Sequence, residues 1–243
     1  MFKKITDKIL RSKGYEITRI QTIDTQIESG KFKWLQKLNI QTVLDVGANT
    51  GQSAIIINKI LPGVKIYSFE PVKECYEILK QLENTNNNLK TFNFALGSSS
   101  GELTINKNEF SASSSLLLMA QLHKNIFPYT RESKPETITI KTLDSIAGEI
   151  EFKTRVLLKA DVQGFELELL KGAKESLRFI EIIIIETSFL ELYDSQPLFD
   201  DIYSFLKISG FIYHGNFDQM PDPKTGLVLQ SDAIFVRKDI NLS

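Results

Sequence analysis

The stretch Thr42-Val-Leu-Asp-Val-Gly-Ala-Asn-Thr-Gly-Gln52 decides the fold, because it joins an apolar run to a glycine-containing turn and then to a helical segment. Val43–Val46 is short enough for one buried strand, and the apolar stretch Ala54–Leu61 predicts the helix that follows. A strand that turns into a helix through glycines lets a ligand approach bare backbone, and the free N–H groups of the helix face that ligand. The stretch therefore predicts a ligand site at the end of the first strand.

The spacing of the glycines discriminates between ligands. A phosphate-binding P-loop requires Lys-Ser/Thr after its glycines, which this stretch lacks. A dinucleotide fingerprint requires Gly-x-Gly-x-x-Gly, whereas Asn49 occupies the position of the second glycine. The remaining pattern, Asp45-x-Gly47-x-x-x-Gly51, is the one used by enzymes that bind S-adenosylmethionine. An ordinary strand-to-helix turn of an α/β protein is the alternative.

Length, charge and cysteine content limit the classes of protein to which the chain can belong. The 243 residues, 42% of them hydrophobic, suffice for one large domain, or for one domain with a terminal extension. The 29 basic and 30 acidic residues nearly cancel, which disfavours a nucleic-acid partner. The single cysteine, Cys75, excludes an internal disulfide and is consistent with a reducing compartment. No apolar run reaches the roughly 18 residues of a membrane span, and the N-terminus lacks signal-peptide features, so we expect a cytoplasmic protein.

Apolar runs of strand length alternate with helix-length segments along most of the chain. The unbroken isoleucines between Glu181 and Glu186 are typical of a strand buried on both faces of a parallel sheet. This alternation predicts a doubly wound α/β sheet. The expected strands are Val43–Val46, Lys65–Glu70, Lys90–Leu96, Arg155–Asp161, Glu181–Glu186, Phe211–Gly215 and Asp232–Arg237. The expected helices are Ala54–Leu61, Glu74–Glu83, Phe165–Lys171 and Pro197–Ser209.

The first 40 residues contain no catalytic pattern. Ile27, Trp34 and Leu38 recur near helical spacing, so a helix is expected to lead into the first strand. We therefore divide the chain into an N-terminal helical extension, residues 1–40, and one domain, residues 41–243.

Residues 98–141 do not follow the alternation of strands and helices. They contain two serine-rich runs, and Leu103–Asn106 and Thr137–Lys141 are expected to pair as an added hairpin. Loops this long inside a compact domain are usually functional or disordered. We interpret residues 98–141 as an insertion that faces the substrate, and a merely mobile insertion is the alternative.

Glu70 is the second candidate ligand contact. In an open parallel sheet the ligand lies at the carboxyl ends of the strands, and Glu70 ends the second predicted strand about twenty residues after the glycines. A carboxylate there can accept both hydroxyls of a ribose, while Gly47 and the backbone after it can meet the carboxylate of a methionine moiety. An exposed acid before Pro71 is the alternative interpretation of Glu70.

The stretch Lys159-Ala-Asp-Val-Gln-Gly164 forms another polar constellation. Strand alternation puts Lys159 and Asp161 on the same side, and a lysine in an apolar strand is costly unless it is paired or reaches the rim. If the strands of Asp161 and Glu186 are neighbours, their carboxylates end about 5 Å apart. Two carboxylates that close need a shared proton or a cation, either Lys159 or a divalent metal. Glu166 lies in the first turn of the next helix, where the favourable interaction of an acid with the helix dipole is enough to explain it without a role in the site.

Together these motifs resemble the FkbM-type methyltransferases, over most of the chain from about Thr42 to Phe211. The block Lys159–Gly172 is the most specific part of the resemblance, and Ala160 departs from it because a bulkier apolar residue is commoner there. The motifs that carry it are Val43–Gln52, Phe69–Pro71, Ala95–Gly97, Thr142–Asp144, Leu158–Gly172, Ile185–Glu186 and Tyr193.

The resemblance implies a Rossmann-like sheet of seven mostly parallel strands in the order 3-2-1-4-5-7-6, with the last strand antiparallel. It implies S-adenosylmethionine as cofactor and, as acceptor, a hydroxyl on a sugar, polyketide or similar small molecule; the polar insertion favours a glycan. Ala95 resembles the position placed against adenine. The residues predicted to bind the cofactor are Asp45, Gly47, Ala48, Asn49, Gly51, Glu70, Pro71, Ala95, Ser113, Ser115 and Asp161.

The predicted chemistry is removal of a hydroxyl proton while the acceptor is aligned with the methyl group. Asp161 is the first candidate for the base, with Glu186 as its partner or second candidate, and Lys159 supplies the positive charge beside them. His123, in the insertion, is a reserve base, although such a histidine is more often structural. A metal held by both carboxylates is the alternative, but His123 and His214 show no ligand spacing.

Three other functions stay open at this point. A nicotinamide-dependent oxidoreductase would also place Glu70 on a ribose, but it would prefer the missing second glycine. A non-catalytic S-adenosylmethionine-binding module of a biosynthetic complex would bind the cofactor without methyl transfer. A nucleic-acid amino methyltransferase would carry Asn/Asp-Pro-Pro-aromatic after the fourth strand, where this chain has Asp161-Val-Gln-Gly164.

Overall fold

The computed structural model describes residues 30–108, 111–127, 130 and 132–240. The chain divides into two compact units, residues 1–34 and residues 35–243. Most of the predicted N-terminal extension, including Ile27, lies outside the described residues. Within the described part of that extension, a short helix, α3, spans Lys33–Lys37.

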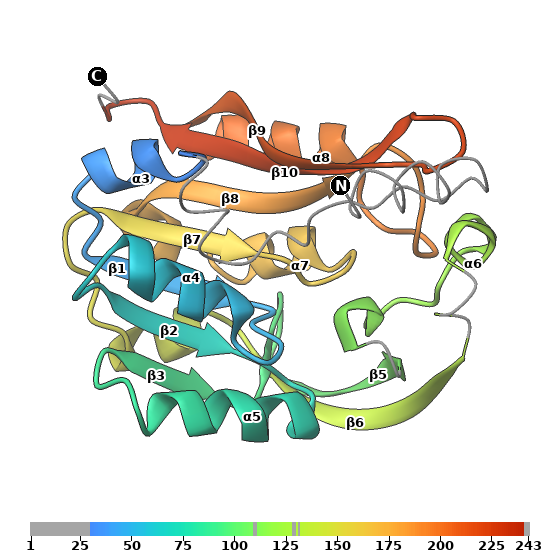
Figure 1. Cartoon of the computed structure of the whole chain (residues 1–243), viewed down its shortest axis with the longest axis horizontal. Helices are drawn as coiled ribbons and strands as arrows, with labels where there is room; N and C mark the ends of the chain where they lie inside the picture. The colour runs from blue at the N-terminus through green and yellow to red at the C-terminus, as the bar shows by residue number, and fades with distance from the viewer. Residues whose placement is uncertain (1–29, 109–110, 128–129, 131, 241–243) are drawn as a thin grey trace, which may run out of the picture. The chain divides into compact units, whose positions relative to one another are not determined.

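A seven-stranded sheet forms the centre of the unit that spans residues 35–243 (Figure 1). Its strands are β1 (Thr42–Val46), β2 (Lys65–Phe69), β3 (Leu89–Phe92), β7 (Val156–Ala160), β8 (Ile180–Ser188), β9 (Phe211–Pro221) and β10 (Val228–Arg237). They lie in the order β3-β2-β1-β7-β8-β10-β9, which is the predicted order 3-2-1-4-5-7-6 when this sheet's strands are numbered along the chain. The last strand, β10, is antiparallel to both neighbours, as predicted. Both C-terminal strands are longer than predicted.

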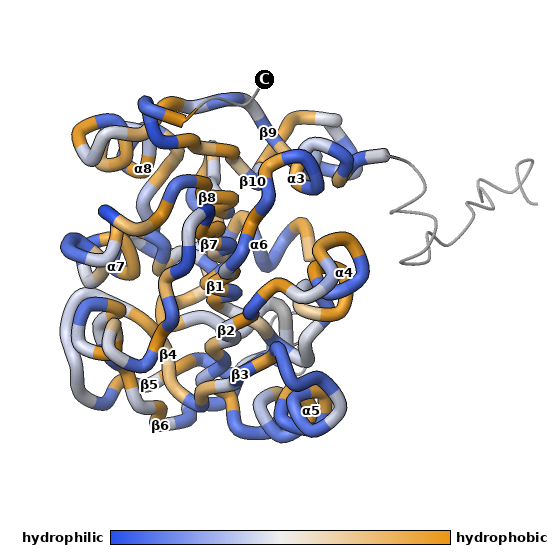
Figure 2. Tube along the Cα trace, turned by 90° about the vertical axis from the view of Figure 1, so that its left-hand side faces the viewer, coloured by the Kyte–Doolittle hydropathy of each residue, from blue (hydrophilic) through white to orange (hydrophobic). Residues whose placement is uncertain are grey.

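Two layers of helices cover the sheet. Helices α4 (Gln52–Ile60) and α5 (Lys73–Glu83) lie on one face, and α7 (Glu166–Lys171) and α8 (Phe199–Ile208) lie on the other (Figures 1 and 2). All four helices match the predicted ranges to within two residues at each end. The shorter helical elements are α6 (Gln121–Ile126), η1 (Ser111–Ser113), η3 (Asp144–Glu149) and η4 (Ser176–Phe179).

The central strands are apolar because both of their faces are covered. Val43 and Leu44 of β1 have no exposed surface, and the four isoleucines Ile182–Ile185 of β8 are at most 6% exposed. Figure 2 shows the hydrophobic residues, in orange, concentrated along these strands. The prediction that the isoleucine run is buried on both faces is confirmed, and removal of these side chains from water stabilises the layered arrangement.

A second sheet is built largely from residues 98–141. Its order is β4-β6-β5, and it packs through Ile105, Ile138 and Ile140 in a cluster that includes Val72 at the start of α5. The predicted hairpin is confirmed and is longer than expected. The strands are β4 (Ala95–Leu96), β5 (Gly101–Asn108) and β6 (Ser133–Lys141).

The prediction of one continuous strand over Lys90–Leu96 is wrong. Its first part belongs to β3 of the central sheet, whereas its last two residues form β4 of the second sheet. Between them, the side-chain amide of Asn93 donates to the carbonyl oxygens of Glu70 and Pro71 at 2.9 and 3.0 Å. These hydrogen bonds anchor the point at which the chain leaves the central sheet.

Gly172, which follows α7, provides a test of the packing between the end of α7 and the second sheet. A Cβ atom on Gly172 would lie 1.9 Å from the carbonyl oxygen of Gly97, the residue after β4. Because the φ of Gly172 is −84°, the restriction is steric rather than conformational. We expect Gly172→Ala to lower the free energy of unfolding by about 1–3 kcal/mol, measured by urea denaturation. Gly148→Ala is the control, because no atom lies within 4 Å of its added Cβ; equal stability of the two variants would contradict this packing.

Candidate functional site

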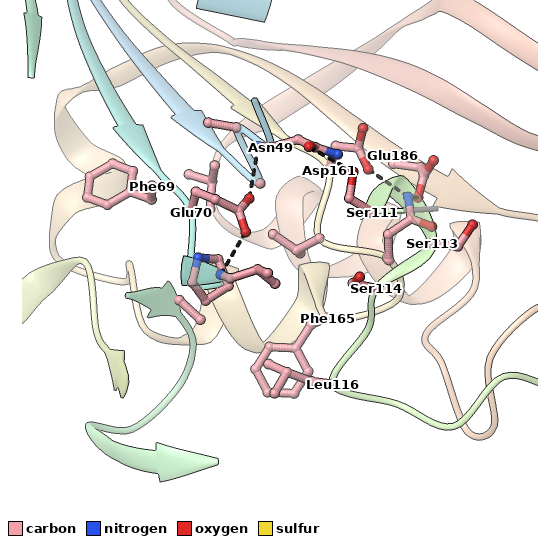
Figure 3. Close-up of a pocket in the computed structure, with 18 of the residues that line it drawn as sticks. Asn49, Phe69, Glu70, Ser111, Ser113, Ser114, Leu116, Asp161, Phe165 and Glu186 are labelled. Carbon is pink, nitrogen blue, oxygen red and sulfur yellow. Dashed lines mark hydrogen bonds between the residues drawn. The ribbon is translucent and has the colours of Figure 1, made fainter. Parts of the chain in front are cut away.

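A cavity of about 400 Å³ lies at the carboxyl ends of the parallel strands β1, β2 and β7. This volume is within the range of about 300–1,000 Å³ typical of ligand sites. The segments that follow the three strands line it, at Gly47, Glu70 and Asp161, and residues of the second sheet and of 111–127 complete the wall. Figure 3 shows Glu70 at one side of this space and Asp161 with Glu186 at another. The cavity is therefore where an open parallel sheet is expected to bind its ligand.

The turn after β1 is held in an unusual conformation by its close approach to β7. Gly47, Asn49 and Gly51 have φ angles of 76°, 49° and 92°, in the left-handed region that favours glycine and asparagine. A Cβ on Gly47 would lie 1.8 Å from the carbonyl oxygen of Asp161. Position 47 therefore requires glycine for both conformation and space.

The backbone N–H groups of this turn are largely used inside the protein, which corrects the expectation that Gly47 and the backbone after it meet a ligand carboxylate. Those of Gly47 and Ala48 both donate to the carbonyl oxygen of Phe69, at 3.1 and 3.0 Å. The first turn of α4, at Gln52 and Ser53, lines the cavity instead. A ligand carboxylate would therefore meet the helix N-terminus rather than Gly47.

Glu70 joins the ends of β1 and β2. Its side chain is 94% buried, and its two oxygens accept the N–H groups of Asn49 at 2.9 Å and Val72 at 2.8 Å. Burial raises the pKa of this carboxyl to about 7, although both hydrogen bonds act in the opposite direction. A carboxylate oxygen accepts more than one hydrogen bond, so Glu70 can receive ligand hydroxyls while it holds the turn.

Lys159 links a buried acid to an acid at the cavity. Its ammonium lies 3.8 Å from Oδ1 of Asp45 and 3.5 Å from Oδ2 of Asp161. Burial alone would lower the pKa of Lys159, but these carboxylates raise it above its ordinary value. Asp45 is fully buried, and burial raises its pKa while Lys159 and the hydroxyl of Ser68 oppose that rise. Asp45 therefore lies behind the cavity wall and contacts Lys159, which lines the cavity.

Asp161 and Glu186 meet at a shared hydrogen-bond donor. The strands that lead to them, β7 and β8, are neighbours, as the prediction required. The side-chain amide nitrogen of Gln163 donates to Oδ1 of Asp161 at 2.7 Å and to Oε2 of Glu186 at 2.9 Å. Burial, followed by the negative charge of Asp161, raises the pKa of Glu186 well above its ordinary value. The site thus contains an acid pair bridged by a neutral amide.

Two further buried residues, Glu166 and Tyr193, hold the loop after β7 through hydrogen bonds. Glu166 is 96% buried, and its Oε1 accepts the N–H groups of Val162 and Gly164, at 3.0 and 3.3 Å. Burial raises the pKa of Glu166 to about 7. The hydroxyl of Tyr193 donates to Oε1 of Gln163 at 2.8 Å. Glu166 therefore holds the loop after β7 as well as lying in the first turn of α7.

His123 lies in the wall formed by residues 111–127. It is 95% buried, and its ring contacts those of Phe127 and Tyr193 edge-on, each with centroids 5.2 Å apart. Burial lowers its pKa to about 4, so the imidazole is neutral at physiological pH. Within the described part of the chain, its Nδ1 has no hydrogen-bond partner. The predicted reserve base therefore lies at the cavity as a neutral side chain.

Most of the predicted site residues meet at one cavity. Those that line it are Gly47, Ala48, Asn49, Glu70, Pro71, Ala95, Ser113, His123, Lys159, Asp161 and Glu186. Three others do not line it, namely Asp45, Gly51 and Ser115. The Cβ position of Gly51 faces Leu79 and Leu82 of α5, and Ser115 donates from its Oγ to the carbonyl oxygen of Gln163 at 2.6 Å.

Sequence reasoning did not assign Gln163 a role, although it stands between two residues that were singled out. The polar stretch Asp161–Gly164 and its position after an apolar strand were the only signals for it.

Among the residues that the structure describes, no group of three or more His, Cys, Asp or Glu side chains is placed to hold a metal ion. Nor does any helix of the described ranges have the length and apolar character to cross a membrane.

A family model for the FkbM methyltransferase domain matches residues 45–213 of the chain. The match begins at Asp45, in the turn-forming motif, and ends in β9. It thus includes the turn, Glu70 and the acid pair of the cavity.

Three curated proteins are similar to the chain. Methyltransferase sdnD of Sordaria araneosa is 27% identical over 169 residues, which cover 60% of this chain and 65% of that protein. 2-O-methyltransferase NoeI of Sinorhizobium fredii is 26% identical, with 63% and 66% covered. Hexuronic acid methyltransferase AglP of Haloferax volcanii is 27% identical, with 58% and 54% covered. The chain thus spans between about half and two-thirds of the length of the relatives it matches.

Removal of the Lys159 ammonium tests its ionic contact with the buried Asp45. Lys159→Met leaves the fully buried Asp45 without its cation, so we expect a loss of about 3–5 kcal/mol in the free energy of unfolding at pH 8. Without the ammonium the folded-state pKa of Asp45 rises further, so stability is lost as pH rises, and the variant should recover partly at pH 5. Urea denaturation at both pH values measures this.

Lys171→Met is the matched control, because Lys171 pairs with Glu168 at the surface, where an ion pair contributes about 0–1 kcal/mol. A Lys159→Met variant as stable as the Lys171→Met variant at pH 8 would contradict the structural role of this contact.

Proposed function

The chain belongs to the FkbM methyltransferase family, and we propose on that basis that it is an S-adenosylmethionine-dependent O-methyltransferase whose acceptor is a hydroxyl of a sugar, glycan or secondary metabolite. The observation that supports this most strongly is the cavity that connects Glu70 to the acid pair Asp161 and Glu186. The names of two relatives, a 2-O-methyltransferase and a hexuronic acid methyltransferase, favour an oxygen acceptor on a sugar.

The residues at the Glu70 end of the cavity fit the proposed cofactor. Glu70 can accept the ribose hydroxyls, and the apolar side chains of Ala95, Leu96 and Ile105 offer a wall against which an adenine can pack. The first turn of α4, at Gln52, presents the positive end of a helix to the amino-acid carboxylate. When bound, S-adenosylmethionine supplies a methyl group activated by its sulfonium sulfur.

The residues at the other end fit proton removal. Asp161 is the proposed general base, because it faces the cavity and Lys159 stabilises a negative charge on its carboxylate. Glu186 is its partner, and it is the member of the pair that burial drives toward the protonated form. His123 is neutral and lines the same cavity, so it can orient an acceptor hydroxyl by one hydrogen bond.

We assign residues 98–141 the role of a substrate-facing segment. Ser111 donates to Oδ1 of Asn49 at 3.0 Å, and Ser115 donates to the loop after β7. The segment therefore contacts both ends of the cavity. Leu116 adds an apolar contact surface to its wall.

Binding of S-adenosylhomocysteine by calorimetry tests the donor end. Because the pKa of Glu70 is about 7 and its carboxylate is the stronger acceptor, affinity should be roughly tenfold lower at pH 6 than at pH 8. Glu70→Gln should weaken binding by about 10–100-fold at pH 8, through loss of a charge-assisted hydrogen bond, and should flatten this pH dependence. Glu77→Gln, on the exposed side of α5, is the control. Stabilisation of the protein by NAD alone in a thermal-shift assay would favour an oxidoreductase instead.

Turnover of the Asp161→Asn variant tests the acceptor end. The amide retains the size of the side chain but cannot take a proton, so methyl transfer to a sugar or glycan acceptor should fall by about 10²–10⁴-fold. Binding of S-adenosylhomocysteine should stay within a few-fold of wild type. Transfer by Asp161→Asn at the wild-type rate would exclude Asp161 as the base, and cofactor binding by wild type without transfer to any acceptor would favour a non-catalytic module.

A further inference from the structure

Both polar atoms of the Gln163 side-chain amide have hydrogen-bond partners, in the acid pair and in Tyr193. Its Nε2 donates to Asp161 at 2.7 Å and to Glu186 at 2.9 Å, and its Oε1 accepts the hydroxyl of Tyr193 at 2.8 Å. An amide has two N–H hydrogens, and here each is directed to a different acid. The hydroxyl of Tyr193 donates to Oε1, which leaves both N–H groups of Nε2 for the two acids.

The backbone of Gln163 is held as firmly as its side chain. Its φ is 53°, a left-handed conformation that costs free energy in a residue other than glycine. The hydroxyl of Ser115 donates to its carbonyl oxygen at 2.6 Å. On either side, the N–H groups of Val162 and Gly164 donate to the buried carboxylate of Glu166. These contacts hold a strained residue in one place beside two acids.

The charges around the pair distinguish its two members. The Lys159 ammonium lies 3.5 Å from Asp161 and stabilises a negative charge there. Glu186 is paired in register with Asp232 of β10, and burial followed by the charges of Asp161, Glu166 and Asp232 raises its pKa. The charged and titratable groups that face the pair are Lys159, Glu166, Tyr193 and Asp232, with Asp45 behind Lys159.

We infer that Gln163 is a positioning residue for the transfer reaction: its amide holds Asp161 and Glu186 at a fixed spacing, and its N–H donation limits how firmly Glu186 keeps the proton of the pair, so that Asp161 is presented to the acceptor. This inference rests on the proposed function. A glutamine suits the role because it donates to both acids without adding a charge. A carboxylate at position 163 would instead be a third acid within hydrogen-bond distance of two others.

Carbon-13 NMR of the side-chain carboxyl groups tests the inference in the full chain, without any acceptor. The resonance of Glu186 is assigned by its loss in Glu186→Gln, and its titration midpoint should lie well above that of the exposed Glu77 in the same spectra. In Gln163→Met, which keeps the length of the side chain but removes the shared donor, the midpoint should move upward by about one pH unit or more, the equivalent of one charge-assisted hydrogen bond.

A midpoint of Glu186 equal to that of Glu77, or an unchanged midpoint in folded Gln163→Met, would overturn the inference. If Gln163→Met does not fold, Tyr193→Phe takes its place, because loss of the hydroxyl releases the orientation of the amide and should shift the midpoint in the same direction. Gln81→Met, at an exposed position of α5, is the control and should leave the midpoint of Glu186 unchanged.

Calorimetry with S-adenosylhomocysteine on the same samples separates this inference from the proposed function. If the wild-type protein binds the compound but Glu186 titrates like Glu77, only the positioning role of Gln163 is contradicted. Wild type that does not bind it would contradict the proposed function, whatever the titration of Glu186 shows.

Discussion

The site depends on one partly buried cation shared by two acids. Lys159 lies in β7 between Asp45 of β1 and Asp161 at the end of its own strand. An ammonium in an apolar sheet is stable only when it is paired, and here the pairing also connects two adjacent strands at the point where both leave the sheet. The turn that carries Gly47 passes directly over this contact, against the backbone of Asp161. Displacement of either strand would therefore disturb the glycine-containing turn and the acid pair together.

The acids that line the cavity or lie behind its wall have different surroundings. Glu70, Glu166 and Glu186 are all buried enough for their pKa values to be raised, whereas Asp161 lies beside the ammonium of Lys159. Carboxyl groups of one chemical type thus have different electrostatic surroundings. The proposed reaction uses this difference, because Asp161 would accept a proton beside acids that burial drives toward the neutral form.

Much of this arrangement could be predicted from the sequence, for identifiable physical reasons. The isoleucine run of β8 has the composition of a strand covered on both faces, and the glycine-containing turn after the first strand indicates where a ligand would bind. The break between β3 and β4 could not be predicted, because it depends on hydrogen bonds from Asn93 to residues about twenty positions earlier in the chain. The burial of Asp45 behind the cavity wall could not be predicted from the motif either. Alternation along a strand shows which side of the sheet a residue faces, but not how deeply it is buried. Gln163 was overlooked because its role arises only when two strands and Tyr193 converge on its amide.

The central claim is that one ligand lies across the cavity between Glu70 and the acid pair. A crystal structure of the chain with S-adenosylhomocysteine tests this most directly. We expect the ribose hydroxyls within hydrogen-bond distance of the Glu70 carboxylate and the sulfur directed toward Asp161 and Glu186. Ligand density at another surface, or a ribose that contacts no atom of Glu70, would contradict the account.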